Sequence, residues 1–372
     1  MEMKQWINRL TKLSFRIHGW LGLTIGLFFL LYGLSGSLLV FRHDLDRYFN
    51  PGLHHLKPGI TKVPADNMYR MILRTHPNLK KLVLHDFPRD RFDSYEFMLY
   101  KRQEHLTDNY LYFVFVNPYT GKIIKEGDYG QLSPSFLRWL YTLHYSLQMG
   151  IPGMFLTAII GLLMLLSLLT GTIIYRKHFW QAMKFRSVFR FNNWRTGASS
   201  LHRIIGVWSL IFNVVLFFTG FWMLREYFNP SMWMLPKQQE NYEVPVNIDR
   251  IVIKAKIHIP GFEPIAVNIP TVKNGEILVR GHMPSTTNVL LQGKASSIAF
   301  DAQTGALKKQ TIIDKQSIEE RFEYMAYQLH AGAFGGDVLK WIYVFFGLSP
   351  AFLSITGGLL WLKRKYPQRK RG

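Results

Sequence analysis

Four histidines recur at matched positions in two parts of the chain. His144 and His330 are each followed by a glycine 17 residues later and by a Thr-Gly pair 26 and 27 residues later. His18 and His202 are each followed by a glycine 4 residues later and by a Ser/Thr-Gly pair 17 and 18 residues later. Imidazole nitrogens are common ligands of iron and zinc. Two register-matched pairs therefore predict that a metal or a metal-containing cofactor is bound.

Haem suits two facing imidazoles better than zinc does. The iron of a B-type haem takes two axial nitrogens, and glycines let the porphyrin approach a backbone. Zinc would need a third and a fourth ligand, and no histidine or acidic residue recurs near either pair. The sequence therefore predicts haem B, with four glycines expected to pack beside it: Gly22, Gly36, Gly206 and Gly220. The alternative is that the histidines cap helices or bond to interfacial carbonyls.

Four apolar runs must position these histidines. They cover approximately residues 17–41, 155–174, 204–224 and 341–362, and each reaches the roughly 20 residues that a helix needs to cross a bilayer core. Glycines inside the first run also suit close helix packing. We therefore expect a membrane bundle of four transmembrane helices, with spans at 17–41 and 204–224 and with spans two and four inside 133–175 and 317–362.

The net charge of +21 is concentrated in three short segments. Residues 1–16, 176–203 and 363–372 are rich in Lys and Arg and contain a single acid, Glu2. Such short basic segments mark the cytoplasmic side of a membrane. We therefore expect both termini in the cytoplasm, a basic loop at 176–203, and contact with anionic lipid rather than nucleic acid. This topology puts His18 and His202 near the inner face and His144 and His330 near the outer face, which predicts these two axial pairs and two haems per chain.

Two long segments lie on the outer side, at 42–132 and 225–316. Each begins with a helical stretch, ending near His76 and His258, and continues into alternating β-branched and aromatic runs. The expected strands are 81–86, 95–100, 110–116, 265–269, 276–280 and 297–300. Each last strand enters a tight turn that contains Gly121 or Gly305. We expect two small α+β domains, related like the spans by an internal two-fold duplication.

Two further helices are expected to lead into the membrane. They are at 133–149 and 317–331 and carry His144 and His330, with bends to the spans at 150–153 and 332–336. The other nine histidines lack a register-matched partner or lie at helix ends, so we expect ordinary solvated or anchoring roles for them: His43, His54, His55, His76, His85, His105, His178, His258 and His282. The absence of cysteine excludes structural disulfides, thiolate iron–sulfur clusters and C-type haem attachment.

These features resemble a known family. The repeated plan of span, outer domain and span, the turns Asn117-Pro118-Tyr119-Thr120-Gly121 and Asp301-Ala302-Gln303-Thr304-Gly305, and the interfacial histidines look like the PepSY-associated transmembrane proteins, also called PiuB-like or iron-regulated membrane proteins. The chain is similar in particular to inner-membrane siderophore reductases of the FoxB type. The resemblance covers essentially all 372 residues.

The resemblance implies a bacterial inner-membrane oxidoreductase with two intertwined periplasmic PepSY domains. The implied haem ligands are His18, His144, His202 and His330, and the implied reaction is the reduction of a periplasmic ferric siderophore or other ferric chelate. Reduction to ferrous iron weakens binding by hard oxygen ligands and so releases the metal. The basic loop is too short for a flavin or nicotinamide domain, so the electrons are expected to come from quinol or a separate cytoplasmic protein.

Two other functions remain open on the sequence alone. PepSY domains elsewhere resemble inhibitors or chaperones of peptidases, so the outer segments could bind peptide while the spans anchor them. This alternative leaves the four matched histidines unexplained. A siderophore or iron permease is the other alternative, although the spans contain no acidic cluster suited to a cation path.

Overall fold

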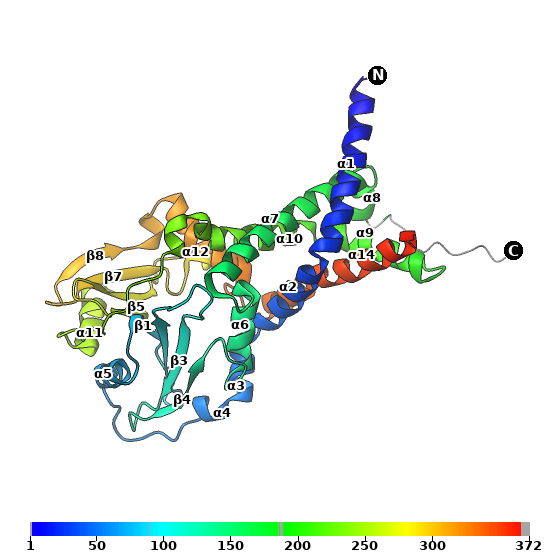
Figure 1. Cartoon of the computed structure of the whole chain (residues 1–372). Coiled ribbons are helices and arrows are strands. Elements are labelled where there is room, and N and C mark those ends of the chain that lie inside the picture. Colours follow the sequence, from blue (N-terminus) through cyan, green and yellow to red (C-terminus); the bar gives the residue numbers. More distant parts are fainter. Residues whose placement is uncertain (1, 89, 185, 187–188, 366–372) are drawn as a thin grey trace. The chain divides into compact units, whose positions relative to one another are not determined.

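The structure is a computed structural model that describes residues 2–88, 90–184, 186 and 189–365 (Figure 1). The chain divides into two compact units. The first, here called the helical unit, comprises Met1–Phe41, Phe155–Glu226 and Leu329–Gly372. The second, the sheet unit, comprises Arg42–Met154 and Tyr227–Gln328. Most of the basic tail predicted at 363–372 lies outside the described residues.

The helical unit contains the predicted apolar spans. Within the part of the chain that the structure describes, three helical stretches are long and apolar enough to cross a membrane: Gly150–Tyr175, Leu210–Phe228 and Asp337–Leu362. The first expected span, 17–41, is instead two helices, α1 (Glu2–Thr24) and α2 (Gly26–Leu39), bent by 62° at Ile25. This bent pair makes a fourth span if it crosses the membrane as one element, so the expected count of four spans stays a prediction.

Short breaks divide two of the other expected spans. The third begins after Ser209, which separates α9 from α10, and the fourth is interrupted at Leu348 between α13 and α14. Helix α9 begins with a capping box formed by Asn193 and Thr196. Each of the two side chains accepts a hydrogen bond from a backbone N–H that the first helical turn leaves unpaired. The remaining helices of this unit are α7 (Gly150–Tyr175), α8 (Phe179–Met183), α9 (Trp194–Trp208), α10 (Leu210–Leu224), α13 (Asp337–Gly347) and α14 (Ser349–Lys365).

Small residues let α2 and α14 pack closely. A Cβ added to Gly33 would lie 2.9 Å from the backbone nitrogen of Ala351, and one added to Gly26 would lie 3.3 Å from Oγ of Ser354. The packing role expected for glycines in the first span is therefore met at these two positions. Gly22 differs, because a Cβ there would meet nothing within 4 Å.

The sheet unit is built on one antiparallel sheet of eight strands in the order β4-β3-β2-β1-β5-β6-β7-β8. Each half of the chain supplies a four-stranded meander, and β1 and β5 join the two, with Leu82 opposite Ile269 and Leu84 opposite Val267. The outer segments are therefore halves of one sheet and not separate small domains. The strands are β1 (Leu79–Asp86), β2 (Tyr95–Lys101), β3 (Leu111–Val116), β4 (Ile123–Asp128), β5 (Glu263–Pro270), β6 (Glu276–His282), β7 (Ser296–Asp301) and β8 (Leu307–Thr311).

All six strands expected from the sequence are present, and two more follow them. Strands β4 and β8 complete the hairpins that begin at the predicted glycine turns, where Gly121 and Gly305 both have φ +66°. A positive φ is strained for residues with a Cβ, which explains the glycines. The exposed, charged sequence of β8 hides the alternation that identified the inner strands.

Two equivalent helices, α5 (Ala65–Thr75) and α11 (Ile248–His258), pack on one face of the sheet. Their first turns cap each other. The carboxylate of Asp249 accepts hydrogen bonds from the backbone nitrogens of Ala65 and Asp66 at 3.1 and 3.0 Å, and Asp66 accepts one from Ile248 N at 2.9 Å. Each aspartate therefore satisfies orphan N–H groups of the helix from the other half.

The opposite face of the first meander is covered by aromatic residues and by α6 (Phe136–Ser146). Strand alternation sends Leu82 and Leu84 to the α5 side and Val83 to the α6 side. The bend after α6 lies earlier than predicted, at Leu147, Gln148 and Gly150, all with positive φ. The other helices are α3 (Arg42–Phe49), α4 (Pro51–His54) and α12 (Ile318–Ala331), which ends at Gly332 with φ +65°.

Candidate histidine site

His18 and His202 face each other inside the helical unit. They come from α1 and α9, which are far apart in sequence, and their ring centroids lie 6.2 Å apart with the ring planes at 78°. Two imidazoles that each coordinate one iron through Nε2 at about 2 Å from opposite sides have their centroids about 6 Å apart. The pair therefore has the separation that a bis-histidine haem iron requires.

Each ring is held by the neighbouring span. Nδ1 of His18 lies 3.0 Å from the carbonyl oxygen of Ser167 and 3.3 Å from Oγ1 of Thr170. A Cβ on Gly171 would lie 3.1 Å from Cε1 of the same ring. The carbonyl, the hydroxyl and the glycine, at positions i, i+3 and i+4 of α7, thus form a socket for the imidazole.

The same socket recurs around His202. Its Nδ1 lies 2.9 Å from Oγ1 of Thr356, and the imidazole also hydrogen-bonds the backbone of Leu353, three residues earlier in α14. A Cβ on Gly357 would lie 3.5 Å from Cε1 of the ring. The two histidines are therefore oriented by equivalent positions of α7 and α14.

His330 occupies a third socket, on α10. Its Nδ1 lies 3.0 Å from the carbonyl oxygen of Leu216 and 3.2 Å from Oγ1 of Thr219. A Cβ on Gly220 would lie 3.0 Å from Cε1 of His330. Gly220 thus lies beside the ring of His330, and its expected packing against a haem stays a prediction.

The hydroxyl bonds decide which ring nitrogen carries the proton. Thr170, Thr219 and Thr356 each donate their hydroxyl hydrogen to a carbonyl of their own helix, at 2.9, 2.7 and 2.7 Å. Their oxygens are then acceptors, as are the backbone carbonyls, so Nδ1 of each histidine must be the donor. A metal would be coordinated through Nε2, and the bond at Nδ1 would fix the ring's orientation.

The donor set distinguishes haem from zinc. Among the described residues, the single group of three or more His, Asp or Glu side chains close enough to hold a metal ion lies elsewhere, in the sheet unit. The His18–His202 pair therefore offers two protein ligands, which is the number that a haem iron takes and fewer than the three or four of zinc sites. The residues present fit a haem.

The remaining predicted residues have different surroundings. His144 lies in α6 of the sheet unit, so its pairing with His330 stays a prediction. Gly36 lies in α2. A Cβ on Gly206 would lie 3.7 Å from Leu353, an ordinary contact, and Gly22 has open space beside it. Their proposed role beside a haem also stays a prediction.

Comparison with known proteins identifies the family of this chain. The family model of the PepSY-associated TM region matches residues 15–364. The chain belongs to this PepSY-associated transmembrane family. Comparison with curated proteins gives no match. The family assignment supports a membrane protein, and it confirms the family resemblance deduced from the sequence.

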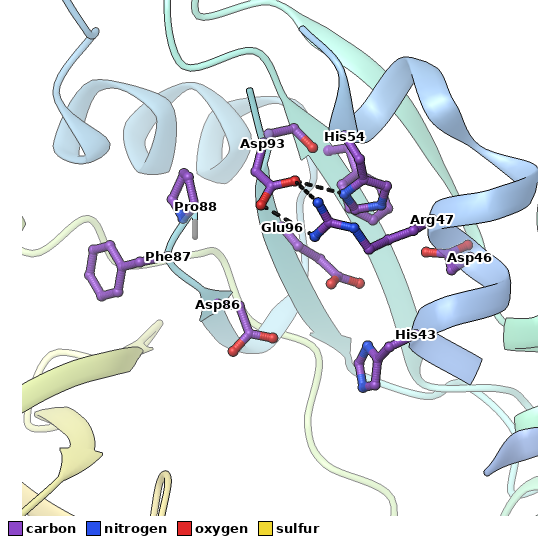
Figure 2. A pocket seen from close by; sticks show the side chains of 11 residues that line it. His43, Asp46, Arg47, His54, Asp86, Phe87, Pro88, Asp93 and Glu96 are labelled. Atoms are coloured by element: carbon purple, nitrogen blue, oxygen red, sulfur yellow. Dashed lines mark hydrogen bonds and ion pairs between the residues drawn. The ribbon is translucent and has the colours of Figure 1, made fainter. Parts of the chain in front are cut away.

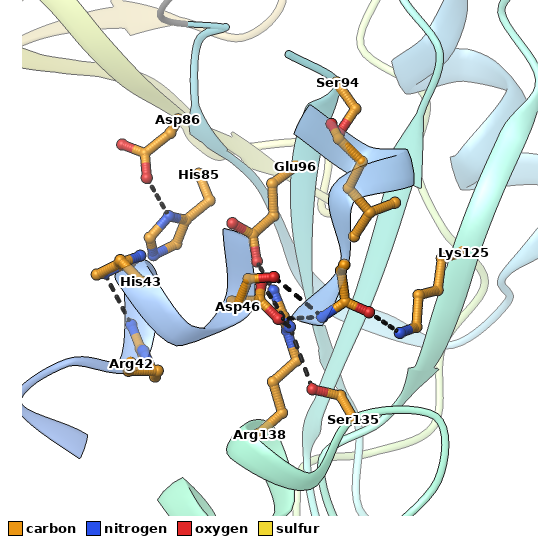
Figure 3. A network of polar contacts seen from close by, with 12 residues as sticks. Arg42, His43, Asp46, His85, Asp86, Ser94, Glu96, Lys125, Ser135 and Arg138 are labelled. Carbon is orange, nitrogen blue, oxygen red and sulfur yellow. Dashed lines mark hydrogen bonds and ion pairs between the residues drawn. The ribbon is translucent and has the colours of Figure 1, made fainter. Parts of the chain in front are cut away.

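The sheet unit of this PepSY-associated protein contains a buried charge network (Figure 3). Nη1 of Arg138 donates to both carboxylate oxygens of Asp46 at 3.1 Å, and Nη2 donates to Glu96 at 2.7 Å. The guanidinium also lies 4.4 Å from the ring centroid of Phe113. Burial raises the pKa of Glu96, but the charges of Arg138 and His85 and the hydrogen bond from Arg138 together outweigh burial and lower this pKa to about 2.

A small cavity adjoins this network (Figure 2). Burial, and then the charge of Arg42, lower the pKa of His43 to about 4, so its imidazole is neutral at pH 7. Repetition in the sequence does not reveal this region, because its residues have no counterparts in the other half. The lining residues are His43, Asp46, Arg47, His54, Asp86, Phe87, Pro88, Asp93, Ser94, Glu96 and Phe115.

Proposed function

We propose that this PepSY-associated protein is a haem-containing reductase of the bacterial inner membrane. It passes electrons outward to a ferric siderophore or another ferric chelate and so releases ferrous iron. The haem is of the B type, because the chain has no cysteine for covalent attachment. Two haems are bound, one by His18 and His202 near the inner face and one by His144 and His330 near the outer face.

The observation that carries this proposal is the geometry of His18 and His202. The two ring centroids lie 6.2 Å apart, and Nδ1 of each ring is held by a threonine hydroxyl, which leaves Nε2 for coordination. Helix capping, the alternative role, would not require two imidazoles from different helices to lie at this separation. A cofactor with two axial positions accounts for both rings.

The distribution of charge along the chain predicts its orientation in the membrane and hence the direction of electron transfer. The basic segments that contain Arg16 and Arg203 lie beside His18 and His202 in the sequence, and cytoplasmic segments of membrane proteins are enriched in such residues. The inner haem is then next to the cytoplasm, and the sheet unit lies in the periplasm. Quinol or a separate cytoplasmic protein supplies the electrons, because the loop at 176–203 is too short for a nucleotide-binding domain.

The reaction needs one electron for each iron. The ferric chelate accepts the electron, and the resulting ferrous ion binds less tightly to hard oxygen donors, so the chelator releases it. When bound, haem supplies one-electron transfer by cycling between ferric and ferrous iron. The histidine sockets hold the axial ligands in one tautomer and orientation through both oxidation states.

The decisive experiment is an optical spectrum of the detergent-purified protein after haem-replete expression. The dithionite-reduced minus oxidised difference should show low-spin B-type haem at about two haems per chain. The reduced protein, mixed anaerobically with a ferric siderophore and a ferrous-iron trap, should be reoxidised as trapped ferrous iron appears. A protein without a Soret band would refute the proposal, and a haem protein that no ferric chelate reoxidises would refute its substrate class.

Single substitutions test the ligand assignment. His18→Ala and His202→Ala should each remove the same haem and leave the other, because each ligates one side of a single iron. His282→Ala is the matched control, since this histidine has no counterpart in the other half, and it should retain both haems. Loss of different haems from His18→Ala and His202→Ala would contradict the pairing.

A further inference from the structure

A β-bulge gathers three metal-ligand side chains, of which Asp86 and Glu96 line the small cavity and His85 lines a second, smaller pocket. Between Leu84 and Asp86 of β1, two residues advance against one on β2, and Asp86 lies opposite Glu96. A bulge turns consecutive side chains toward the same side of a strand, which brings His85 and Asp86 together against Glu96. The candidate ligand atoms of these three residues all lie within 4.8 Å of one another, and all three side chains are half-buried.

Two further imidazoles belong to the same cavity. His43 lines the small cavity, and also lines the second, smaller pocket together with His85 and Glu96 (Figure 3). His54 also lines the small cavity, and its Nε2 is buried without a hydrogen-bond partner among the described residues, although its Nδ1 lies 3.0 Å from Asp93. A buried polar atom without a partner is costly and calls for a water or an ion. The cavity thus presents imidazole nitrogens as well as carboxylates.

The size of the cavity decides what class of ligand fits. Its volume is about 60 Å³ (Figure 2), whereas sites for small organic molecules usually exceed about 300 Å³. A whole siderophore is too large. A single ion with one or two waters fits, because a water occupies roughly 30 Å³ in the liquid.

We propose that His85, Asp86 and Glu96, with His43 beside them, form a binding site for one divalent first-row metal ion. Imidazole and carboxylate ligands together suit Fe²⁺, Mn²⁺ and Zn²⁺. That the cellular ion is Fe²⁺ rests on the proposed reductase function, which produces this ion on the same side of the membrane. The site then receives ferrous iron after it leaves the chelator.

Two cations already contact the proposed ligands and set the affinity. Nζ of Lys294 lies 2.8 Å from Asp86, and Arg138 donates to Glu96 at 2.7 Å. An incoming ion must displace the lysine ammonium, which is on a flexible stem, while Arg138 is buried and fixed by Asp46. Binding is therefore weak and reversible, which suits a site that passes an ion on.

The test measures Mn²⁺ binding to full-length, metal-stripped protein in detergent. Binding is monitored by electron paramagnetic resonance as the loss of the signal of free Mn²⁺. The wild type should bind one Mn²⁺ per chain, with Fe²⁺ competing under anaerobic conditions. His85→Ala should weaken binding by about 10- to 100-fold. Lys294→Met should tighten binding, since it removes the competing ammonium. His105→Ala, at an exposed histidine outside the cavity, is the control and should bind like the wild type.

The opposite effects of two substitutions separate a metal site from a structural ion network. If the wild type binds no Mn²⁺, or if His85→Ala and Lys294→Met both bind as the wild type does, the proposal is wrong. Glu96→Gln also removes a partner of Arg138, so its metal binding is interpreted only together with its thermal unfolding midpoint. Haem content is recorded for every variant. If the protein binds the metal but contains no haem, the proposed reductase function is wrong and the metal site is supported. If it contains haem but binds no metal, the metal site is wrong and the reductase proposal is unaffected.

Discussion

Oγ1 of Thr356 lies 2.9 Å from Nδ1 of His202 and donates its own hydrogen to the carbonyl of Phe352 at 2.7 Å. The hydroxyl therefore accepts a hydrogen bond from the imidazole and fixes the tautomer in which Nε2 can coordinate a metal. Thr219 and His330 repeat this relationship on α10. The Thr-Gly pairs are thus parts of histidine sockets, which gives their repetition in the sequence a physical reason.

Removing the hydroxyl should weaken haem binding at one site. Thr356→Val keeps the shape of the side chain but leaves Nδ1 of His202 without this acceptor, and loss of a partner that orients a metal ligand typically costs 10- to 100-fold in affinity. We expect a lower haem-to-protein ratio and altered electron paramagnetic resonance g-values for the inner haem. Thr172→Val is the control, because that hydroxyl bonds to Leu168 of its own helix, and it should change neither.

A methyl group in a socket should displace the ring that the socket holds. The Cβ of Gly171→Ala would lie 3.1 Å from Cε1 of His18, and that of Gly220→Ala 3.0 Å from Cε1 of His330. Because these distances are shorter than an ordinary van der Waals contact, the rings must move. Gly171→Ala should perturb the inner haem and Gly220→Ala the outer one, as measured by redox titration of each haem.

The control for these glycines is Gly161→Ala on α7, where the added Cβ would lie 3.5 Å from Phe221, an ordinary contact. This substitution should leave the reduction potentials of both haems unchanged. If Gly171→Ala and Gly220→Ala perturbed the same haem, His18 and His330 would belong to one site and the assignment by depth would be wrong.

Repetition in the sequence was enough to predict the family, the apolar spans, six strands and the two glycine turns. It also identified the matched histidines and the Thr-Gly pairs. It could not show that the pairs hold the rings, because half of each socket is a backbone carbonyl, such as that of Ser167, which any residue supplies. The bend at Ile25 was equally hidden, since the apolar run at 17–41 continues through it without a proline.

The cavity and the joined sheet depend on contacts that sequence periodicity does not encode. Strand alternation predicts that β1 and β5 are strands, but pairing between them is a long-range contact of two similar edges. The bulge at His85 interrupts alternation for one residue, which a single sequence does not reveal. His43, His54 and His85 were set aside because they lack counterparts, although a site confined to one half needs none.

Mutual capping should couple the two halves of the sheet unit. Asp249→Ala removes the acceptor for the backbone nitrogens of Ala65 and Asp66, at the start of a helix from the other half. Loss of an N-cap costs about 0.5–2 kcal/mol, and two N–H groups are affected here. We expect a lower thermal unfolding midpoint and faster hydrogen exchange in α5. Exchange that increases only in α11 would contradict the coupling.

Arg138 should contribute more to stability than a surface arginine does. Its side chain is 8% exposed and pairs with Asp46 and Glu96, so Arg138→Met leaves two largely buried carboxylates without their partner. Removing one member of a buried pair typically destabilises by about 3–5 kcal/mol. Arg74→Met is the matched control. Its partner is Glu243, the side chains are 70% and 31% exposed, and such pairs contribute about 0–1 kcal/mol. Equal unfolding midpoints for the two variants would show that the network around Arg138 is dispensable.

The same network should make the sheet unit sensitive to acid. Burial raises the pKa of Glu96, but the charges of Arg138 and His85 and the hydrogen bond from Arg138 together hold it at about 2, below the ordinary value of 4.5. A carboxyl with a lowered pKa in the folded state contributes stability above its unfolded pKa and loses it as the pH falls toward the folded pKa. The thermal unfolding midpoint, measured in EDTA, should therefore decrease as the pH is lowered from about 4.5 to about 2.

Glu96→Gln should be less stable than the wild type at pH 7, and its unfolding midpoint should decrease less over this pH range. The control is Glu276→Gln, on a side chain 51% exposed, which should behave like the wild type. An unchanged acid profile in Glu96→Gln would mean that other carboxylates control acid unfolding.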